Sequence, residues 1–291
     1  MHSEYNVTLV KMKFSQAKGI HSVWTAYLGY YLVVAVIFIS AFDQLVMAQH
    51  QAGAKSIYRA TLYTRNIKTT AIWFKKFLGF SISDVKMNES AKLKVPGFQI
   101  QLIQPKRSVV ESNLKLPAGK TLVNGFYETG FLVNNLDSIY QVMDDRGIKV
   151  DSVLTTDSEL GREKFTAKDP DGNRISFYKS LPSDNLNTSC RPFLISLITS
   201  DYQNTLKWYE TRLGFKQSHD LDVPIENMFV RILQQGNIVL KIIHSPNRSV
   251  ETTELLSSDI ELMGFKKFGL KLSGGQTREV LDNDGNQLIV K

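Results

Sequence analysis

The stretch Asp169-Pro170-Asp171-Gly172-Asn173, followed by Arg174-Ile175-Ser176-Phe177-Tyr178, decides how the rest of the chain is interpreted. Proline fixes φ, aspartate hydrogen-bonds its own backbone, and glycine and asparagine tolerate positive φ, so the first five residues predict a tight turn. The apolar alternation after the turn predicts a strand with one buried face. A reduced copy, Asp282-Asn283-Asp284-Gly285-Asn286 followed by Gln287-Leu288-Ile289-Val290, ends the sequence and predicts that the fold is duplicated.

A second repeat lies upstream of these turns. Residues 57–80 and 194–215 both run strand, short loop, amphipathic helix and Leu-Gly-Phe. Apolar residues recur at i, i+4, i+7 and i+11 in both helices, the spacing of a helix that packs on a sheet. Gly79 and Gly214 stand where a helix end needs positive φ. The apolar faces consist of Ile67, Ala71, Phe74 and Leu78 in the first helix and of Tyr202, Leu206, Tyr209 and Leu213 in the second.

A weaker third copy of this strand and helix pattern begins at Glu128, and a truncated fourth copy ends the sequence. The first half, residues 55–180, therefore contains two strand-helix-strand-strand-strand units. The second half, residues 192–291, should contain two as well, but between Phe268 and Asp282 there is room only for a strand and a tight turn. The missing helix leaves one sheet face to be covered by the first half or by a second chain, as in a homodimer. Residues 181–191, rich in Pro, Ser and Asn, form the linker.

Composition excludes several classes of protein. The 291 residues are 43% hydrophobic and 22% charged, which is typical of a globular chain. The net charge of +7 comes from scattered lysines and arginines without interleaved aromatics, so nucleic acid is not expected as a partner. The single cysteine, Cys190, excludes an intramolecular disulfide framework and a cysteine-rich zinc site.

The first 54 residues resemble an export signal more than part of the fold. Lysines precede the uncharged apolar run at residues 22–42, and Val46-Met47-Ala48 offers small residues for cleavage after Ala48. The same run is long enough to remain as a membrane anchor. Both interpretations predict an exported, periplasmic or extracytoplasmic protein that meets the membrane only through this segment if it is uncleaved. A buried core helix is the third interpretation.

Three motifs resemble those of the vicinal oxygen chelate superfamily, which includes glyoxalase I, bleomycin-resistance proteins and extradiol dioxygenases. They are the helix end from Trp73 to Phe80, the Phe-x-Val-x-x-Leu-Asp segment from Phe131 to Asp137, and the turn and strand from Asp169 to Phe177. The resemblance implies an α+β fold in which tandem βαβββ modules form two such domains, the C-terminal one truncated. It also implies a cup whose floor holds a divalent metal in family enzymes.

The family's metal-ligand positions, carried over through this resemblance, do not hold metal ligands. Metal ions need imidazole, carboxylate or amide oxygen donors, whereas arginine and lysine offer no free lone pair. We therefore predict neither a metal site nor a cofactor. The carried-over positions are Arg59, Gln101, Glu128 and Ser176 in the first half, and Leu194, Lys241, Lys267 and Ile289 in the second.

Polar residues with strand periodicity are the candidates for a ligand site in the cup. Arg59 and Glu128, at related family positions, either form an ion pair where the metal would sit, or Arg59 binds the carboxylate of a ligand. Lys241 and Lys267 should face water, or acidic groups of a neighbour, because an unpaired buried ammonium is costly. No catalytic residue is assigned. The candidates that line the cup are Arg59, Thr61, Gln99, Gln101, Glu128, Ser176 and Tyr178.

The predicted function is non-catalytic, because nearly every family position has lost its coordinating side chain. We expect an exported module that binds a small organic ligand, with an anion favoured by Arg59, or that serves in interactions. A metal-dependent lyase or isomerase of the glyoxalase type is the second hypothesis, and a dioxygenase is excluded for lack of histidine pairs. A membrane-anchored structural partner is the third.

Overall fold

The computed structural model of the chain describes residues 55–86, 88–105, 121–123, 125–148, 150–218, 229–244, 249–251, 264–272 and 276–291. The predicted signal or anchor at residues 22–42, and the predicted cleavage after Ala48, lie outside these residues. Within them, no helix is long and apolar enough to cross a membrane. Residues 54–291 form one compact unit, to which the whole description below refers.

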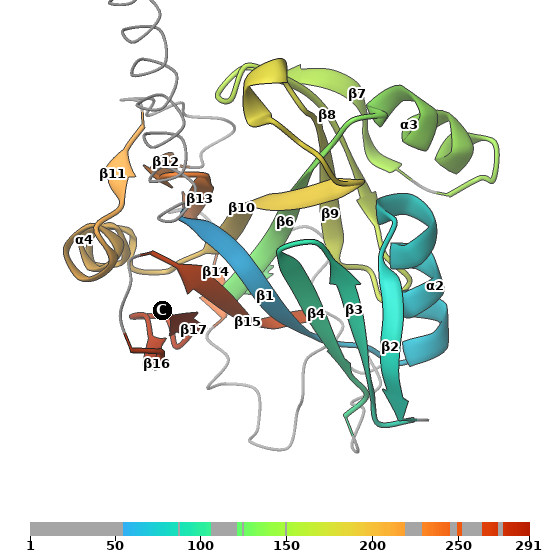
Figure 1. Cartoon of the computed structure of the whole chain (residues 1–291). Helices are drawn as coiled ribbons and strands as arrows, with labels where there is room; N and C mark the ends of the chain where they lie inside the picture. Colours follow the sequence, from blue (N-terminus) through green and yellow to red (C-terminus); the bar gives the residue numbers. More distant parts are fainter. Residues whose placement is uncertain are drawn as a thin grey trace, which may run out of the picture. The chain divides into compact units, whose positions relative to one another are not determined.

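Strands and helices follow the predicted βαβββ order in three complete modules and one truncated module (Figure 1). The fourth module consists of a strand and a hairpin, and its described residues contain no helix. The tight turn predicted between Phe268 and Asp282 falls on residues 273–275, which lie outside the described residues. The first module comprises β1 (Ser56–Tyr63), α2 (Ile67–Leu78), β2 (Ser81–Lys86), β3 (Ser90–Val95) and β4 (Phe98–Ile103). The second comprises β6 (Gly125–Val133), α3 (Leu136–Asp144), β7 (Val150–Asp157), β8 (Arg162–Lys168) and β9 (Arg174–Lys179). The third comprises β10 (Cys190–Ile198), α4 (Tyr202–Leu213), β11 (Lys216–Gln217), β12 (Phe229–Gln235) and β13 (Ile238–His244), and the fourth comprises β15 (Gly264–Lys271), β16 (Arg278–Leu281) and β17 (Gln287–Val290). The remaining elements are the short helix η2 (Pro182–Asp184) and the strands β5 (Thr121–Val123) and β14 (Ser249–Glu251).

Each of the two large sheets takes one module from each half of the chain. The seven-stranded sheet has the order β16-β17-β15-β1-β4-β3-β2, and the eight-stranded sheet has the order β11-β12-β13-β10-β6-β9-β8-β7. Antiparallel pairs of first strands, β1 with β15 and β6 with β10, join the modules. The parallel pair of β5 and β14 also links the two halves. The boundaries 55–180 and 192–291 therefore separate sequence repeats, but neither repeat forms a sheet of its own.

The two long helices begin and end as their sequences dictate. Asn66 Oδ1 accepts a hydrogen bond from the Thr69 amide at 3.0 Å, and Asp201 caps α4 in the same way through Asn204. Gly79 and Gly214 end the helices with φ of 72° and 71°. These positive values are the conformation that glycine adopts without steric cost.

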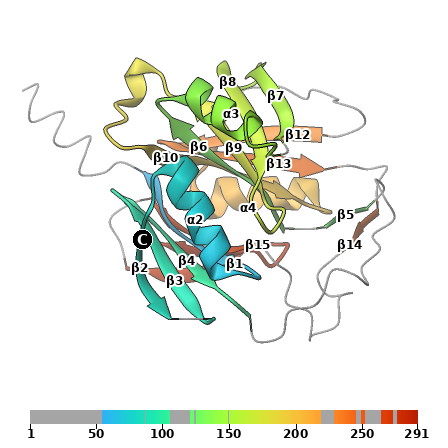
Figure 2. The ribbon, with the colours of Figure 1, turned by 90° about the vertical axis from the view of Figure 1, so that its right-hand side faces the viewer.

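The helix-facing sides of both sheets share one apolar core. From α2, Trp73 contacts Phe177 of the eight-stranded sheet with ring centroids 6.1 Å apart. In the truncated module, Phe268 is fully buried, and Phe126 of the first half packs against it at 4.8 Å. The same chain therefore covers the sheet face that the missing helix leaves. Figure 2 shows α2 in front of the strands of the first module.

The two Asp-Gly-Asn turns fasten the long helices to the following module. In the first turn, Asp169 accepts hydrogen bonds from the amides of Asp171 and Asn173, both at 2.9 Å. The next acid of the turn, Asp171, accepts a 3.2 Å hydrogen bond from Thr70 of α2. The C-terminal copy repeats the contact, because Thr205 of α4 donates to Asp284 at 3.1 Å. The repeated motif thus explains how modules that lie in different sheets are held together.

Candidate functional site

Four of the predicted cup-lining residues lie together on the seven-stranded sheet. In register across the sheet, Thr61 of β1 lies between Gln101 of β4 and Lys267 of β15, and Arg59 lies between Gln99 and Gly269. Alternation places these side chains opposite the buried residues that face α2. We call the set Arg59, Thr61, Gln99, Gln101 and Lys267 the polar face.

Gly269 makes room for Arg59 on this face. A Cβ atom at position 269 would overlap Arg59 Cγ and would come within 2.8 Å of Tyr58 Cε1. A glycine inside a strand often marks such a close approach of neighbouring groups. The absence of a side chain at Gly269 therefore lets the arginine stem lie across β15.

The charges of the polar face are unevenly paired. Lys267 Nζ lies 2.9 Å from Oε1 of Glu279 on β16, which is separated from β15 by β17. Arg59 is half-buried, and none of the described carboxylates lies within ion-pair distance of it. Lys92 and Lys94 of β3 extend the same cross-strand rows beyond Gln101 and Gln99. Neither lysine was among the residues predicted from the sequence, although the alternation of the Ser90–Val95 segment places both on the polar side.

The other three predicted residues lie on the eight-stranded sheet, so the predicted pair between Arg59 and Glu128 is wrong. Glu128 Oε1 accepts a 2.6 Å hydrogen bond from Ser176, which itself accepts one from Thr166 at 2.6 Å. Arg174 Nε lies 3.9 Å from Glu128 Oε2. The prediction failed because it joined the first two modules into one cup, whereas β1 and β6 belong to different sheets.

Tyr178 of β9 is fully buried on the eight-stranded sheet. Its hydroxyl donates to Asp157 Oδ2 at 3.1 Å, and Lys164 Nζ lies 2.9 Å from the same oxygen. Burial alone would raise the pKa of Asp157, but Lys164 and Lys241 hold it below its usual value. An apolar cluster fills the surroundings, and its members are Leu132, Tyr178, Phe193, Leu194, Ile232 and Val239, with Leu160 and Leu186 packed against them. This face is therefore occupied by the protein's own side chains.

Of the two alternatives expected for the second-half lysines, exposure to open water is not the one that the structure shows. Lys241 Nζ lies 2.8 Å from Glu159 Oε2, and only 17% of the lysine side chain is exposed. Lys267 pairs with Glu279, as described above, and 22% of its side chain is exposed. Both acidic partners belong to this chain: Glu279 lies on β16, and Glu159 lies in the turn between β7 and β8. The sequence alone could not place either of them beside its lysine. The alternative in which the lysines meet acidic groups is the one that the structure supports.

Two further described residues with reactive side chains, Cys190 and His244, are engaged in packing or hydrogen bonds. Cys190 is fully buried, and burial raises the pKa of its thiol to about 12. His244 Nδ1 lies 3.0 Å from the Thr199 carbonyl oxygen, and the ring stacks on Tyr202. In the part of the chain that the structure describes, no three His, Cys, Asp or Glu side chains gather as metal ligands would.

Modules of βαβββ order that join through their first strands define a fold of the vicinal oxygen chelate class. Residues 56–177 match the model of the Glyoxalase/Bleomycin resistance protein/Dioxygenase superfamily, and this part of the chain is a domain of that superfamily. No curated protein matched the sequence.

Solved structures extend the likeness to most of the chain. A point mutant of glyoxalase I from Zea mays is 15% identical, with a TM-score of 0.54, and the match covers 85% of this chain and 95% of the maize protein. Unmutated glyoxalase I from Zea mays is 14% identical, with a TM-score of 0.53, and the match covers 83% of this chain and 94% of that chain. At this identity the likeness establishes the fold, while function has to be argued from the site.

Proposed function

We propose that the chain is a metal-free member of the superfamily that binds a small organic anion on the polar face. The observation that carries the proposal is the half-buried Arg59, for which the described residues provide no carboxylate partner. Gln99 is its direct cross-strand neighbour, and Thr61 and Gln101 form the adjacent row. A guanidinium binds a carboxylate through two parallel hydrogen bonds, and the neighbouring amides and hydroxyl can bind the remaining polar atoms of a ligand.

The side chains on both sheets do not fit a divalent cation. On the polar face, Arg59 and Lys267 repel a cation, and glutamine amides alone are weak ligands. On the eight-stranded sheet, Glu128 is the carboxylate among the carried-over positions, and Ser176 already donates to it. The remaining positions there hold Leu194 and Lys241, neither of which can coordinate a metal ion. A polar site without a paired nucleophile and base supports binding over catalysis.

A thermal-shift screen of small mono- and dicarboxylates, with divalent metals in parallel, tests this proposal. A carboxylate at a hundred times its Kd should stabilise the wild-type chain by about 2.7 kcal/mol and raise its Tm. The shift should vanish in Arg59→Gln and persist in Arg146→Gln, a matched change at an exposed arginine that follows α3. A stoichiometric metal retained through dialysis would overturn the proposal in favour of the metal-dependent lyase or isomerase.

The exported location is part of the same proposal, and it is supported by the sequence of residues 22–48. Cleavage after Ala48 would leave Gln49 as the N-terminus. Intact-mass measurement of the mature protein checks this directly. A full-length mass would instead support the membrane-anchored structural partner. Light scattering at several concentrations would reveal a homodimer.

A further inference from the structure

A cavity lies on the side of the first module opposite the polar face, between α2 and the strands β2 and β3. Its volume is about 530 Å³, within the range of small-molecule sites. Ile67, Ala71 and Ile72 line it from the helix, and Ile82 and Val85 line it from the edge strand. Half of the surface of Ile72 and 58% of Val85 remain exposed, so the cavity is open to solvent and largely apolar.

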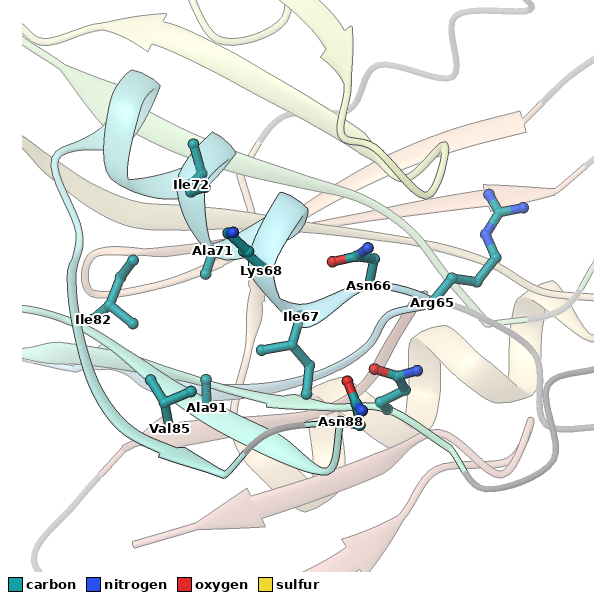
Figure 3. A pocket seen from close by; sticks show the side chains of 11 residues that line it. Arg65, Asn66, Ile67, Lys68, Ala71, Ile72, Ile82, Val85, Asn88 and Ala91 are labelled. Atoms are coloured by element: carbon teal, nitrogen blue, oxygen red, sulfur yellow. The ribbon is translucent and has the colours of Figure 1, made fainter.

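The polar lining residues are amides and cations, and none of the eleven lining residues is acidic. Figure 3 shows Ile82, Val85 and Ala91 toward one end of the cavity and Asn66 and Asn88 toward the other. The cavity is therefore asymmetric, with an apolar end and an end that offers amide groups.

The two cations of the lining differ in their pairing. Arg65 Nε lies 3.1 Å from Asp171 Oδ1, so this arginine is already neutralised by the Asp-Gly-Asn turn. Lys68 is exposed, and none of the described acidic side chains pairs with it. The lining thus presents one lysine that a ligand anion can neutralise.

We propose that this cavity binds an amphipathic carboxylate, with its alkyl chain against Ile67, Ile72, Ile82 and Val85 and its carboxylate facing Lys68 and the asparagine amides. The apolar walls supply affinity because they bury the alkyl chain of the ligand, and the lysine selects an anion over a cation. The site lies on the helix side of the sheet, opposite the polar face, and does not rest on the function proposed above.

Calorimetric titration of the full-length chain with n-alkyl carboxylates from butanoate to decanoate tests the proposal. Affinity should rise about fourfold for each added methylene until the cavity is full. Octylammonium should bind at least about tenfold more weakly than nonanoate, which carries the same alkyl length. Equal affinity for butanoate and decanoate would overturn the proposal.

Two variants and one control distinguish binding in this cavity from binding elsewhere on the protein and from a general effect of charge. Lys68→Glu should weaken octanoate at least about tenfold without harming the fold, because an acid in the first turn favours a helix. Val85→Glu, at an exposed position, should remove the dependence on chain length. Lys75→Glu changes the same charge in the last turn of α2, away from the cavity, and should leave binding unchanged. Undiminished binding by Lys68→Glu and Val85→Glu would assign the carboxylates to another site, such as the apolar residues 22–42 or the polar face.

Discussion

Asp169 illustrates how a single residue of the turn motif responds to its surroundings. The residue is only 5% exposed, and burial raises the pKa of its carboxyl to about 6 against the hydrogen bonds from Asn173 and Asp171. Its ordinary pKa in the unfolded chain is 3.8. Between these two values the folded protein holds a proton that the unfolded chain has released. The stabilising contribution is therefore complete below about pH 4 and is lost as the pH rises through 6.

Replacing this carboxyl with an amide should remove that pH dependence. For Asp169→Asn we expect the free energy of unfolding, relative to wild type, to change by up to roughly 3 kcal/mol between pH 4 and pH 7. Urea unfolding of both proteins at several pH values measures this difference in the free energy of unfolding. Carboxyls with a lowered pKa, such as Asp157 and Asp184, contribute equally to both proteins, so their contributions cancel in the difference. Asp144→Asn, at an exposed helix end, should show no such difference. If the free energy of unfolding varies with pH in the same way for Asp169→Asn and wild type, the pH dependence does not come from Asp169.

At the scale of elements, local sequence predicts whether a segment forms a helix, a strand or a turn. Which strands pair with one another depends on packing between segments that are distant in the sequence. The glycine ends of α2 and α4 and the alternation of Gln99 and Gln101 follow from short spacings, and the structure confirms them. The partner of β1 does not follow from local sequence, because β15 and β6 are both first strands of modules. For the same reason Arg59 and Glu128 were placed correctly on their strands but wrongly opposite one another.

The two helix-ending glycines differ in what surrounds them, which yields a paired prediction. Both need positive φ, so alanine at either position should cost about 1 kcal/mol. At Gly79 an added Cβ would also lie 2.5 Å from Ser189 Oγ, whereas at Gly214 the nearest atom is the flexible Gln235 amide at 3.2 Å. Chemical denaturation should therefore show that Gly79→Ala is the more destabilising by about 1–3 kcal/mol. Equal losses would mean that Ser189 moves aside freely.

At the scale of the whole molecule, both sheets are continuous across the two sequence halves. The β1–β15 and β6–β10 pairs cross between them, and the Phe126–Phe268 contact does so as well. Within each half, the threonine-to-aspartate contacts of the turns connect α2 and α4 to the other sheet. Each module is thus joined to a second module through its sheet and to a third through a contact between a long helix and an Asp-Gly-Asn turn. Such an arrangement predicts a single cooperative unfolding transition rather than two.

Cutting the chain between the halves tests this interlocked arrangement. A protease site inserted after the exposed Asn187 would separate residues 54–187 from residues 188–291. Because each sheet draws strands from both fragments, the cleaved protein should elute as one species in size-exclusion chromatography and separate only in denaturant. Each fragment expressed alone should fail to give a cooperative thermal transition, since it would expose the edges of β1 and β6 or of β10 and β15. Independent elution of two folded fragments would show that the halves are separate domains.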